Sequence, residues 1–210
     1  MTNSKQKKHQ LAIVGLGNPG PSFQKNRHNI GSHFLNYLAA KWSNNDWKIS
    51  KKCLAEIIFI RKNGRKIILA KPTVFMNQSG KTLNLLKQFY NLSLQSIFIA
   101  HDDTDIALGD FKIQFGRGSA GHKGVESIIQ ELKSKNFCRI RIGVRPFSRH
   151  QKAEKLVLKN FNDEEKKILE GIFPLIEERL IETYILNNKQ INEKPKAKKY
   201  SKPKHLKKDN

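Results

Sequence analysis

Short apolar runs alternate with segments of helical periodicity along this chain of 210 residues, and the alternation constrains its fold more than any other feature. LAIVGLG at 11–17 and SIFIA at 96–100 are continuous apolar runs, which are typical of strands buried on both faces. Over 29–42 and 79–90 the apolar positions recur at helical spacing, with Asn29 as an expected helix cap. The sequence therefore predicts an α/β domain in which helices surround a mixed, twisted β-sheet.

A β-hairpin is the clearest local prediction. AEIIFI and KIILAKP flank KNGR at 62–65, and an Asn-Gly pair tolerates the positive φ angles that a tight turn requires. The other expected elements are strands over 109–115 and 137–144, helices over 125–132 and 163–187, and a glycine-rich loop, GRGSAGHKG, over 116–124.

The composition changes at both ends of the chain. Polar, lysine-bearing residues 1–10 predict a disordered leader without a secretory signal, and residues 191–210, rich in lysine and poor in apolar residues, predict a basic, disordered tail. The segment between them, 11–190, is expected to form one domain. No apolar run approaches the roughly 20 residues of a membrane span. Cys53 and Cys138 lie far apart, as expected for free thiols of a cytoplasmic protein.

The formal net charge of +22 predicts a polyanionic partner, of which nucleic acid is the commonest. An alternative is that the lysine excess records an AT-rich genome. The charge is not confined to the ends, since residues 11–192 alone carry about +13 when both ends are subtracted. A basic body favours the first interpretation.

GLGNPG at 15–20 matches the glycine pattern of dinucleotide-binding folds. That site requires a helix to open immediately, so that its amides face a pyrophosphate. Here Pro19 and Pro21 surround Gly20, and helical spacing begins only near Asn29. We therefore expect no nicotinamide or flavin site. Polar residues also follow two other strands, in KPTVFMNQSGK and AHDDTD, and functional groups are expected at such points.

Six motifs in order carry a specific resemblance: VGLGNPG, NRHNIG, KPTVFMNQSGK, HDDTDIALG, GSAGHKG and FCRIRIGV. Together they resemble the successive signatures of bacterial peptidyl-tRNA hydrolases over residues 11 to about 186. The resemblance implies a cofactor-free enzyme that hydrolyses the ester between a peptide and the tRNA 3′-ribose. The chemistry agrees, because ester hydrolysis near neutral pH needs a base such as histidine to activate water.

The resemblance assigns roles to individual residues. His28 is the expected general base, Asp102 orients it, and Asn18 belongs to the same catalytic site. From the residues alone, Asp103 and Asp105 remain alternatives to Asp102, and Asp105 could instead cap a turn.

Four further positions are expected to bind substrate or tRNA. The resemblance implies that Asn77 binds the substrate. Phe75, together with Met76, forms either an apolar wall or part of the core. Phe23 stands where the family usually has Tyr, and Lys123 where it usually has Asn.

The other expected tRNA contact is Arg141, at the acceptor stem. Arg139 and Arg141 alternate with isoleucines, which places both on one face of the sheet. Gln114 replaces a lysine that often contacts tRNA, and Arg117 or Lys123 could take over a phosphate contact.

We thus expect a monomeric, cytoplasmic hydrolase with peptidyl-tRNA as its partner, no metal, no membrane contact, and ribosome proximity through the tail. No helix offers a His pair with ligand spacing, and no G-x-S-x-G marks a serine nucleophile. The alternative is a non-catalytic RNA-binding relative, which Lys123 favours and the retained Asn18, His28, Asn77 and Asp102 oppose.

Overall fold

The computed structural model describes residues 10–146 and 152–182. The expected tail, the expected leader apart from Gln10, and the end of the helix predicted to reach residue 187 lie outside these residues.

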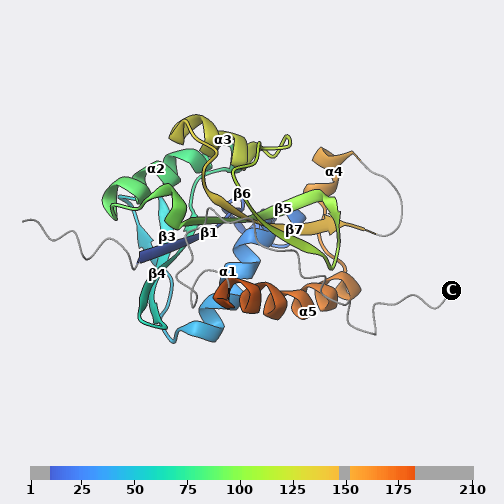
Figure 1. Ribbon diagram of the computed structural model, residues 1–210. Helices are drawn as coiled ribbons and strands as arrows, with labels where there is room; N and C mark the ends of the chain where they lie inside the picture. The colour runs from blue at the N-terminus through green and yellow to red at the C-terminus, as the bar shows by residue number, and fades with distance from the viewer. Residues whose placement is uncertain (1–9, 147–151, 183–210) are drawn as a thin grey trace, which may run out of the picture.

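Within the described residues, seven strands form one mixed sheet (Figure 1) in the order β2-β3-β4-β1-β5-β7-β6. β4, β1, β5 and β7 run parallel, whereas β2, β3 and β6 are antiparallel to their neighbours. The strands are β1 (Gln10–Gly15), β2 (Lys48–Ser50), β3 (Ala55–Lys62), β4 (Arg65–Pro72), β5 (Ile97–Ala107), β6 (Phe111–Phe115) and β7 (Cys138–Arg145). The predicted α/β class and mixed sheet are confirmed.

Helices cover both faces of the sheet (Figure 1): α1 and α5 lie against one face, and α2 and α3 against the other. The helices are α1 (Ile30–Trp42), α2 (Ser79–Phe89), α3 (Lys123–Leu132), α4 (Ala153–Val157) and α5 (Asp163–Leu180). Among the described residues, four 3-10 turns join these helices to the strands: η2 (Pro21–Phe23), η3 (Arg27–Asn29), η4 (Met76–Gln78) and η5 (Leu94–Ser96).

Two hydrophobic clusters explain why the strand sequences are apolar without interruption. In β1, Leu11 and Ile13 face the cluster under α1 and α5, whereas Ala12 and Val14 face the cluster under α2 and α3. Because successive side chains of a strand point to opposite faces, a strand buried on both sides must be apolar at every position.

The predicted hairpin is confirmed, since β3 and β4 pair antiparallel and Asn63 and Gly64 have φ angles of 49° and 74°. The predicted cap of α1 is wrong in its detail. Asn29 stands at the N-cap position, but its side chain makes no capping hydrogen bond. It bonds the backbone of Asn18 instead.

The central position of β1 determines where polar groups meet. β1 lies between β4 and β5, and all three strands are parallel, so their carboxyl ends share one edge. In open α/β sheets such a point, where the strand order reverses, is where ligands bind. The start of α1 lies very close to this edge: a Cβ on Gly15 would lie 2.4 Å from the carbonyl oxygen of Gly31. Glycine at both positions therefore allows η3 and α1 to approach the strand ends.

Every helix in the described part of the chain is too short or too polar to cross a membrane. Cys53 and Cys138 are both buried and neither forms a disulfide, in agreement with the prediction of two free thiols.

Candidate active site

His28 lies in η3, and the residue before it fixes this turn to the C-terminal part of the domain. Nη2 of Arg27 donates to both carboxylate oxygens of Glu165, at 2.8 and 2.7 Å, and its guanidinium lies 4.7 Å from the centre of the Phe161 ring. Glu165 also completes the capping box of α5 with Asn162. The turn that carries His28 is therefore anchored to α5 by a buried ion pair.

Asp102 meets His28 from the carboxyl end of β5. Nδ1 of His28 lies 2.7 Å from Oδ1 of Asp102, and both residues are buried. The carboxylate of Asp103 is engaged elsewhere, since Oδ2 accepts a 2.6 Å hydrogen bond from Nε of Arg141 and Oδ1 accepts from the backbone amide of Asp105. Asp105 itself is exposed. Asp103, and not Asp105, is therefore the residue whose side chain caps this turn. The geometry favours Asp102 as the partner of His28.

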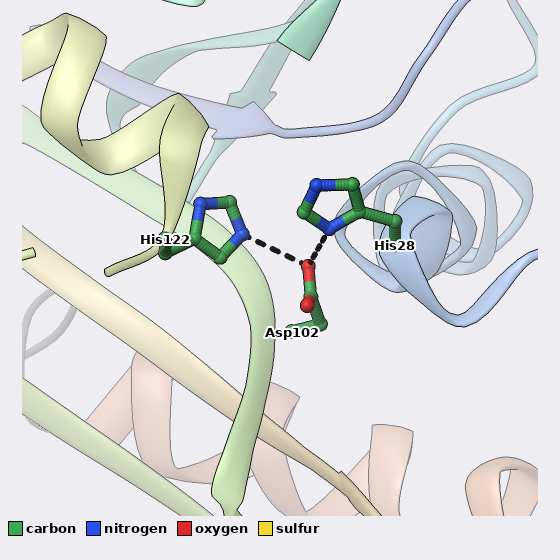
Figure 2. A group of neighbouring side chains, drawn as sticks. All are labelled: His28, Asp102 and His122. Atoms are coloured by element: carbon green, nitrogen blue, oxygen red, sulfur yellow. Dashed lines mark hydrogen bonds and ion pairs between the residues drawn. The ribbon is translucent and has the colours of Figure 1, made fainter. Parts of the chain in front are cut away.

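His122 completes the group, and the sequence assigned it no role. Its Nε2 lies 2.9 Å from the same Oδ1 of Asp102, as Figure 2 shows, with the two imidazoles entering from η3 and from the start of α3. The ring centres of His28 and His122 are 4.9 Å apart. The only signal in the sequence was a histidine at the end of a glycine-rich loop just before a helix.

The hydrogen bonds of His122 fix its tautomer. Its Nδ1 caps α3 by accepting from the backbone amides of Gly124 and Val125, at 3.1 and 3.3 Å. An accepting nitrogen carries a lone pair, so the ring proton of neutral His122 is on Nε2 and is donated to Asp102. The carboxylate of Asp102 likewise requires a proton on Nδ1 of His28, which leaves Nε2 of His28 as the basic atom.

The environment keeps Asp102 ionised. Burial alone would raise the pKa of Asp102, but electrostatic attraction to His122 and His28 and the hydrogen bonds from these two rings outweigh it and hold the pKa well below its usual range. Beneath them, His101 donates from Nδ1 to the backbone carbonyl of Asp102 at 2.6 Å. Burial, followed by the charge of His122, lowers the pKa of His101 well below that of free histidine.

Asn18 is held by two neighbours. Its Oδ1 accepts a 2.8 Å hydrogen bond from the backbone amide of Met76. The side chain of Asn29 bonds its backbone twice, because Nδ2 of Asn29 donates to the carbonyl of Asn18 and Oδ1 accepts from its amide, each at 2.9 Å. The carbonyl of the Asn18 side chain is therefore occupied, and the amide hydrogens on Nδ2 are the groups that it can offer a ligand.

Two predicted substrate-binding aromatic residues lie together. Phe23 and Phe75 form an edge-to-face pair with ring centres 6.3 Å apart, and Phe75 is 53% exposed. Phe75 is thus not part of the core, whereas the adjacent Met76 is buried in the cluster under α2 and α3. Asn77 is exposed in η4. Phe75 and Asn77 flank Met76, whose backbone amide contacts Asn18.

Two predicted tRNA contacts come from α3 and β7. Lys123 is the first residue of α3 and is exposed. Arg141 is half-buried, with Nη1 donating to Oε1 of Gln114 at 2.6 Å in addition to its ion pair with Asp103. Arg139 is buried, so Arg141 is the more accessible of the two arginines.

His28, Asp102 and His122 also offer three ligand atoms within 4.8 Å of one another, a set that could hold a metal ion. The hydrogen bonds oppose this use. A metal on Nε2 of His122 would require a proton on Nδ1, which faces two amide hydrogens. The three side chains are therefore of types that bind metals, but the capping of α3 by Nδ1 of His122 is incompatible with a metal on Nε2.

The chain is similar to known proteins over most of its length. The family model described as peptidyl-tRNA hydrolase matches residues 12–206. The chain is 39% identical over 179 residues to the peptidyl-tRNA hydrolase of Rickettsia bellii, and the matched segment covers 85% of this chain and 95% of that protein. It is 41% identical over 157 residues to that of Mycolicibacterium smegmatis, covering 74% and 81% respectively.

Among solved structures, the chain is similar to the peptidyl-tRNA hydrolase of Acinetobacter baumannii, with a TM-score of 0.77, 28% identity, and coverage of 90% of this chain and 97% of that one. A peptidyl-tRNA hydrolase in complex with N-propanol gives a TM-score of 0.76 at 28% identity, covering 85% and 90%. The sequence motifs, the fold and the relatives converge, and the chain belongs to the peptidyl-tRNA hydrolase family.

Proposed function

We propose that this protein hydrolyses the ester bond of peptidyl-tRNA, with His28 as the general base and Asp102 as the group that orients it. The observation that carries the proposal is the 2.7 Å contact between Nδ1 of His28 and the ionised, buried Asp102. A carboxylate on one ring nitrogen fixes the tautomer and stabilises the imidazolium that forms when the other nitrogen takes a proton.

In this mechanism Nε2 of His28 removes a proton from a water molecule as the water oxygen attacks the ester carbonyl carbon. The tetrahedral intermediate carries a negative oxygen, and Nδ2 of Asn18 is a neutral donor suited to it. The intermediate collapses by breaking the bond to the ribose oxygen. The imidazolium returns its proton to that oxygen, so the products are a peptide carboxylic acid, which ionises, and free tRNA.

His122 belongs to the same site as a positioning residue. With Nε2–H directed at Oδ1 of Asp102, it shares the carboxylate with His28. A charged acceptor that receives two hydrogen bonds is held in one rotamer and stays ionised. His122 thereby supports the base through Asp102.

Binding of the substrate is divided between two groups of residues. Phe23, Phe75 and Asn77 are suited to the peptide and the ester, whereas Lys123 and Arg141 are suited to phosphates of the acceptor stem. Phosphate contacts position a nucleic acid without reading its sequence, which allows many tRNAs to be accepted.

The non-catalytic alternative rests on Lys123. Its exposed position at the start of α3 suits a phosphate contact and takes no part in the His28–Asp102 pair. Family membership and the assembled pair therefore favour an active enzyme.

We further propose that the enzyme acts as a monomer in the cytoplasm without metal or cofactor, and that the lysines of residues 191–210 add attraction for tRNA near the ribosome. These lysines lie outside the described residues, and the proposal for them rests on charge alone.

The test is the release of free tRNA from N-acetyl-aminoacyl-tRNA by the purified protein in the presence of EDTA. Turnover that is unaffected by the chelator supports the metal-free hydrolase. Binding of tRNA without turnover supports the non-catalytic alternative. Activity that is lost in EDTA and restored by a divalent ion contradicts the metal-free mechanism.

A further inference from the structure

On the sheet face that carries α2, two exposed phenylalanines flank Tyr90, which is partly buried against the core, and the proposed reaction does not use this aromatic cluster. Phe59 of β3 and Phe89 of α2 are each 57% exposed. The ring of Tyr90 lies between them, edge to face with Phe59 at 5.6 Å and with Phe89 at 5.0 Å between ring centres. Large apolar groups exposed together, rather than singly, mark a surface that binds something. We call these three residues the aromatic patch.

The aromatic patch is remote from the proposed active site. α2 begins beside η4, which contacts Asn18, and ends at Phe89. Its 11 residues span roughly 16 Å at 1.5 Å per residue. A role of the aromatic patch in binding the reacting ester is therefore excluded by distance.

Cations share the same face of the sheet. Phe59 and Arg61 alternate with Ile58 and Ile60, which face the opposite cluster, and Lys66 is the cross-strand partner of Arg61. Lys52 also reaches the aromatic patch, with Nζ 5.7 Å from the centre of the Phe89 ring. Arg61, Lys66 and Lys52 are all exposed.

Acidic groups are nearly missing from these elements. Between Lys48 and Lys66 and along α2 the sequence contains one carboxylate, Glu56. The alternation of β3 places Glu56 on the opposite face, where it pairs with Lys71 at 2.8 Å. The surface that β3, β4 and α2 contribute to this face is thus aromatic and positive, and Glu131 of α3, on the same face, accepts a 2.9 Å hydrogen bond from Nδ2 of Asn84.

Flat exposed rings bordered by cations match the two parts of an unpaired nucleotide, a base that stacks and a phosphate that is neutralised. A second copy of this chain fits less well, because a formal charge of +22 on each copy opposes contact between two basic faces. We propose that the aromatic patch, with Lys52, Arg61 and Lys66, is a second RNA-binding surface that takes a short unpaired RNA segment. It is independent of the ester hydrolysis proposed above.

The test measures fluorescence anisotropy of a labelled ten-nucleotide oligoadenylate titrated with the full-length protein. The variant Phe59→Ala/Phe89→Ala should weaken binding by about tenfold or more, because each stacked base contributes substantially to affinity. Ile49→Ala is the matched control, since Ile49 is 73% exposed but faces the other side of the sheet. Its affinity should equal that of the unmodified protein.

A second pair of variants distinguishes binding at the aromatic patch from nonspecific attraction of RNA to a positively charged protein. Arg61→Gln and Lys62→Gln remove the same charge from adjacent residues, but Nζ of Lys62 lies 4.8 Å from the ring centre of Trp42 on the opposite face. Arg61→Gln should weaken oligoadenylate binding several-fold more than Lys62→Gln. This pair also keeps the proposal testable if the double phenylalanine variant does not fold.

Release of tRNA from N-acetyl-aminoacyl-tRNA at saturating substrate should be unchanged in all four variants, which separates this proposal from the hydrolase mechanism. Equal affinities of Arg61→Gln and Lys62→Gln, or an unchanged affinity of a folded Phe59→Ala/Phe89→Ala protein, would overturn it. So would a dimer in sedimentation that the double variant dissociates, or patch-dependent binding of phosphatidylserine vesicles without binding of the oligonucleotide.

Discussion

His122 joins the N-terminus of α3 to Asp102 through opposite edges of one imidazole ring. Nε2 lies 2.9 Å from Oδ1 of Asp102, whereas Nδ1 accepts from the backbone amides of Gly124 and Val125. A helix cap and a link to the carboxylate that orients the base are therefore the same side chain. The two roles predict different consequences for two substitutions.

His122→Ala removes both roles, whereas His122→Asn keeps an oxygen that can cap the helix but does not reach Asp102. We expect both variants to lower the single-turnover rate by about tenfold, equivalent to about 1.4 kcal/mol of barrier. Only the alanine variant should also lose about 1 kcal/mol of unfolding free energy, the usual contribution of an N-cap. Urea denaturation and single-turnover hydrolysis measure the two effects. Equal stabilities of the two variants would show that the cap is unimportant.

Asp102→Asn should lower the hydrolysis rate on the order of 10³-fold, since an amide does not fix the His28 tautomer or stabilise its imidazolium. Asp103→Asn should have less than a tenfold effect, because Asp103 bonds Arg141 and the Asp105 amide rather than the base. Single-turnover rates of both variants check this. Equal losses would mean that the pairing of the base is assigned wrongly.

His101 predicts a pH dependence of stability. Its depressed pKa means that the folded protein excludes a proton which the unfolded chain binds below about pH 6.5. Its Nε2 is buried without a hydrogen-bond partner among the described residues, and the groups around it are His122, Asp102 and Arg139. Stability should therefore fall as the pH falls below 6.5, by up to about 1.4 kcal/mol per pH unit from this residue.

The comparison is between the protein and His101→Asn, which retains a donor toward the Asp102 carbonyl but does not titrate. Unfolding free energies from urea denaturation at pH 7.5 and 5.5 should differ less in the variant. Because the other histidines are common to both proteins, an identical pH dependence would show that His101 is protonated in the folded state.

Removal of residues 194–210 should leave the single-turnover rate at saturating enzyme unchanged and weaken tRNA binding chiefly at low salt. Lysine charges that attract phosphates are screened by salt, so the slope of log affinity against log salt should become shallower. A tenfold loss of the saturated rate would instead place the tail in the active site.

Most of the fold could be predicted because most of its elements are determined by residues close together in the sequence. An uninterrupted apolar strand, the Asn-Gly turn and the helical stripe of α2 each depend on neighbours a few residues away. β2 and α4 were missed, since the three residues of β2 and the five of α4 are too few to show a period.

The candidate site was predicted less completely. The choice among Asp102, Asp103 and Asp105 depends on which face of β5 each residue occupies, and this follows only from the pairing of β5 with β7. Asn29 looked like a cap because its position is right, whereas its side chain bonds residue 18 across a loop. His122 meets Asp102 only after α3 docks, a contact across 20 residues that no local pattern encodes.

The assignment of His28 as the base, and not as an anchor for tRNA, is tested by single-turnover hydrolysis of N-acetyl-aminoacyl-tRNA by His28→Ala, with tRNA affinity measured in parallel. We expect the rate to fall by at least about 10²-fold, the usual contribution of a positioned base, while the dissociation constant for tRNA stays within a few-fold. His33→Gln, which changes a histidine on the adjacent helix, serves as the control and should have a near-normal rate. Near-normal hydrolysis by His28→Ala would show that His28 is not the base.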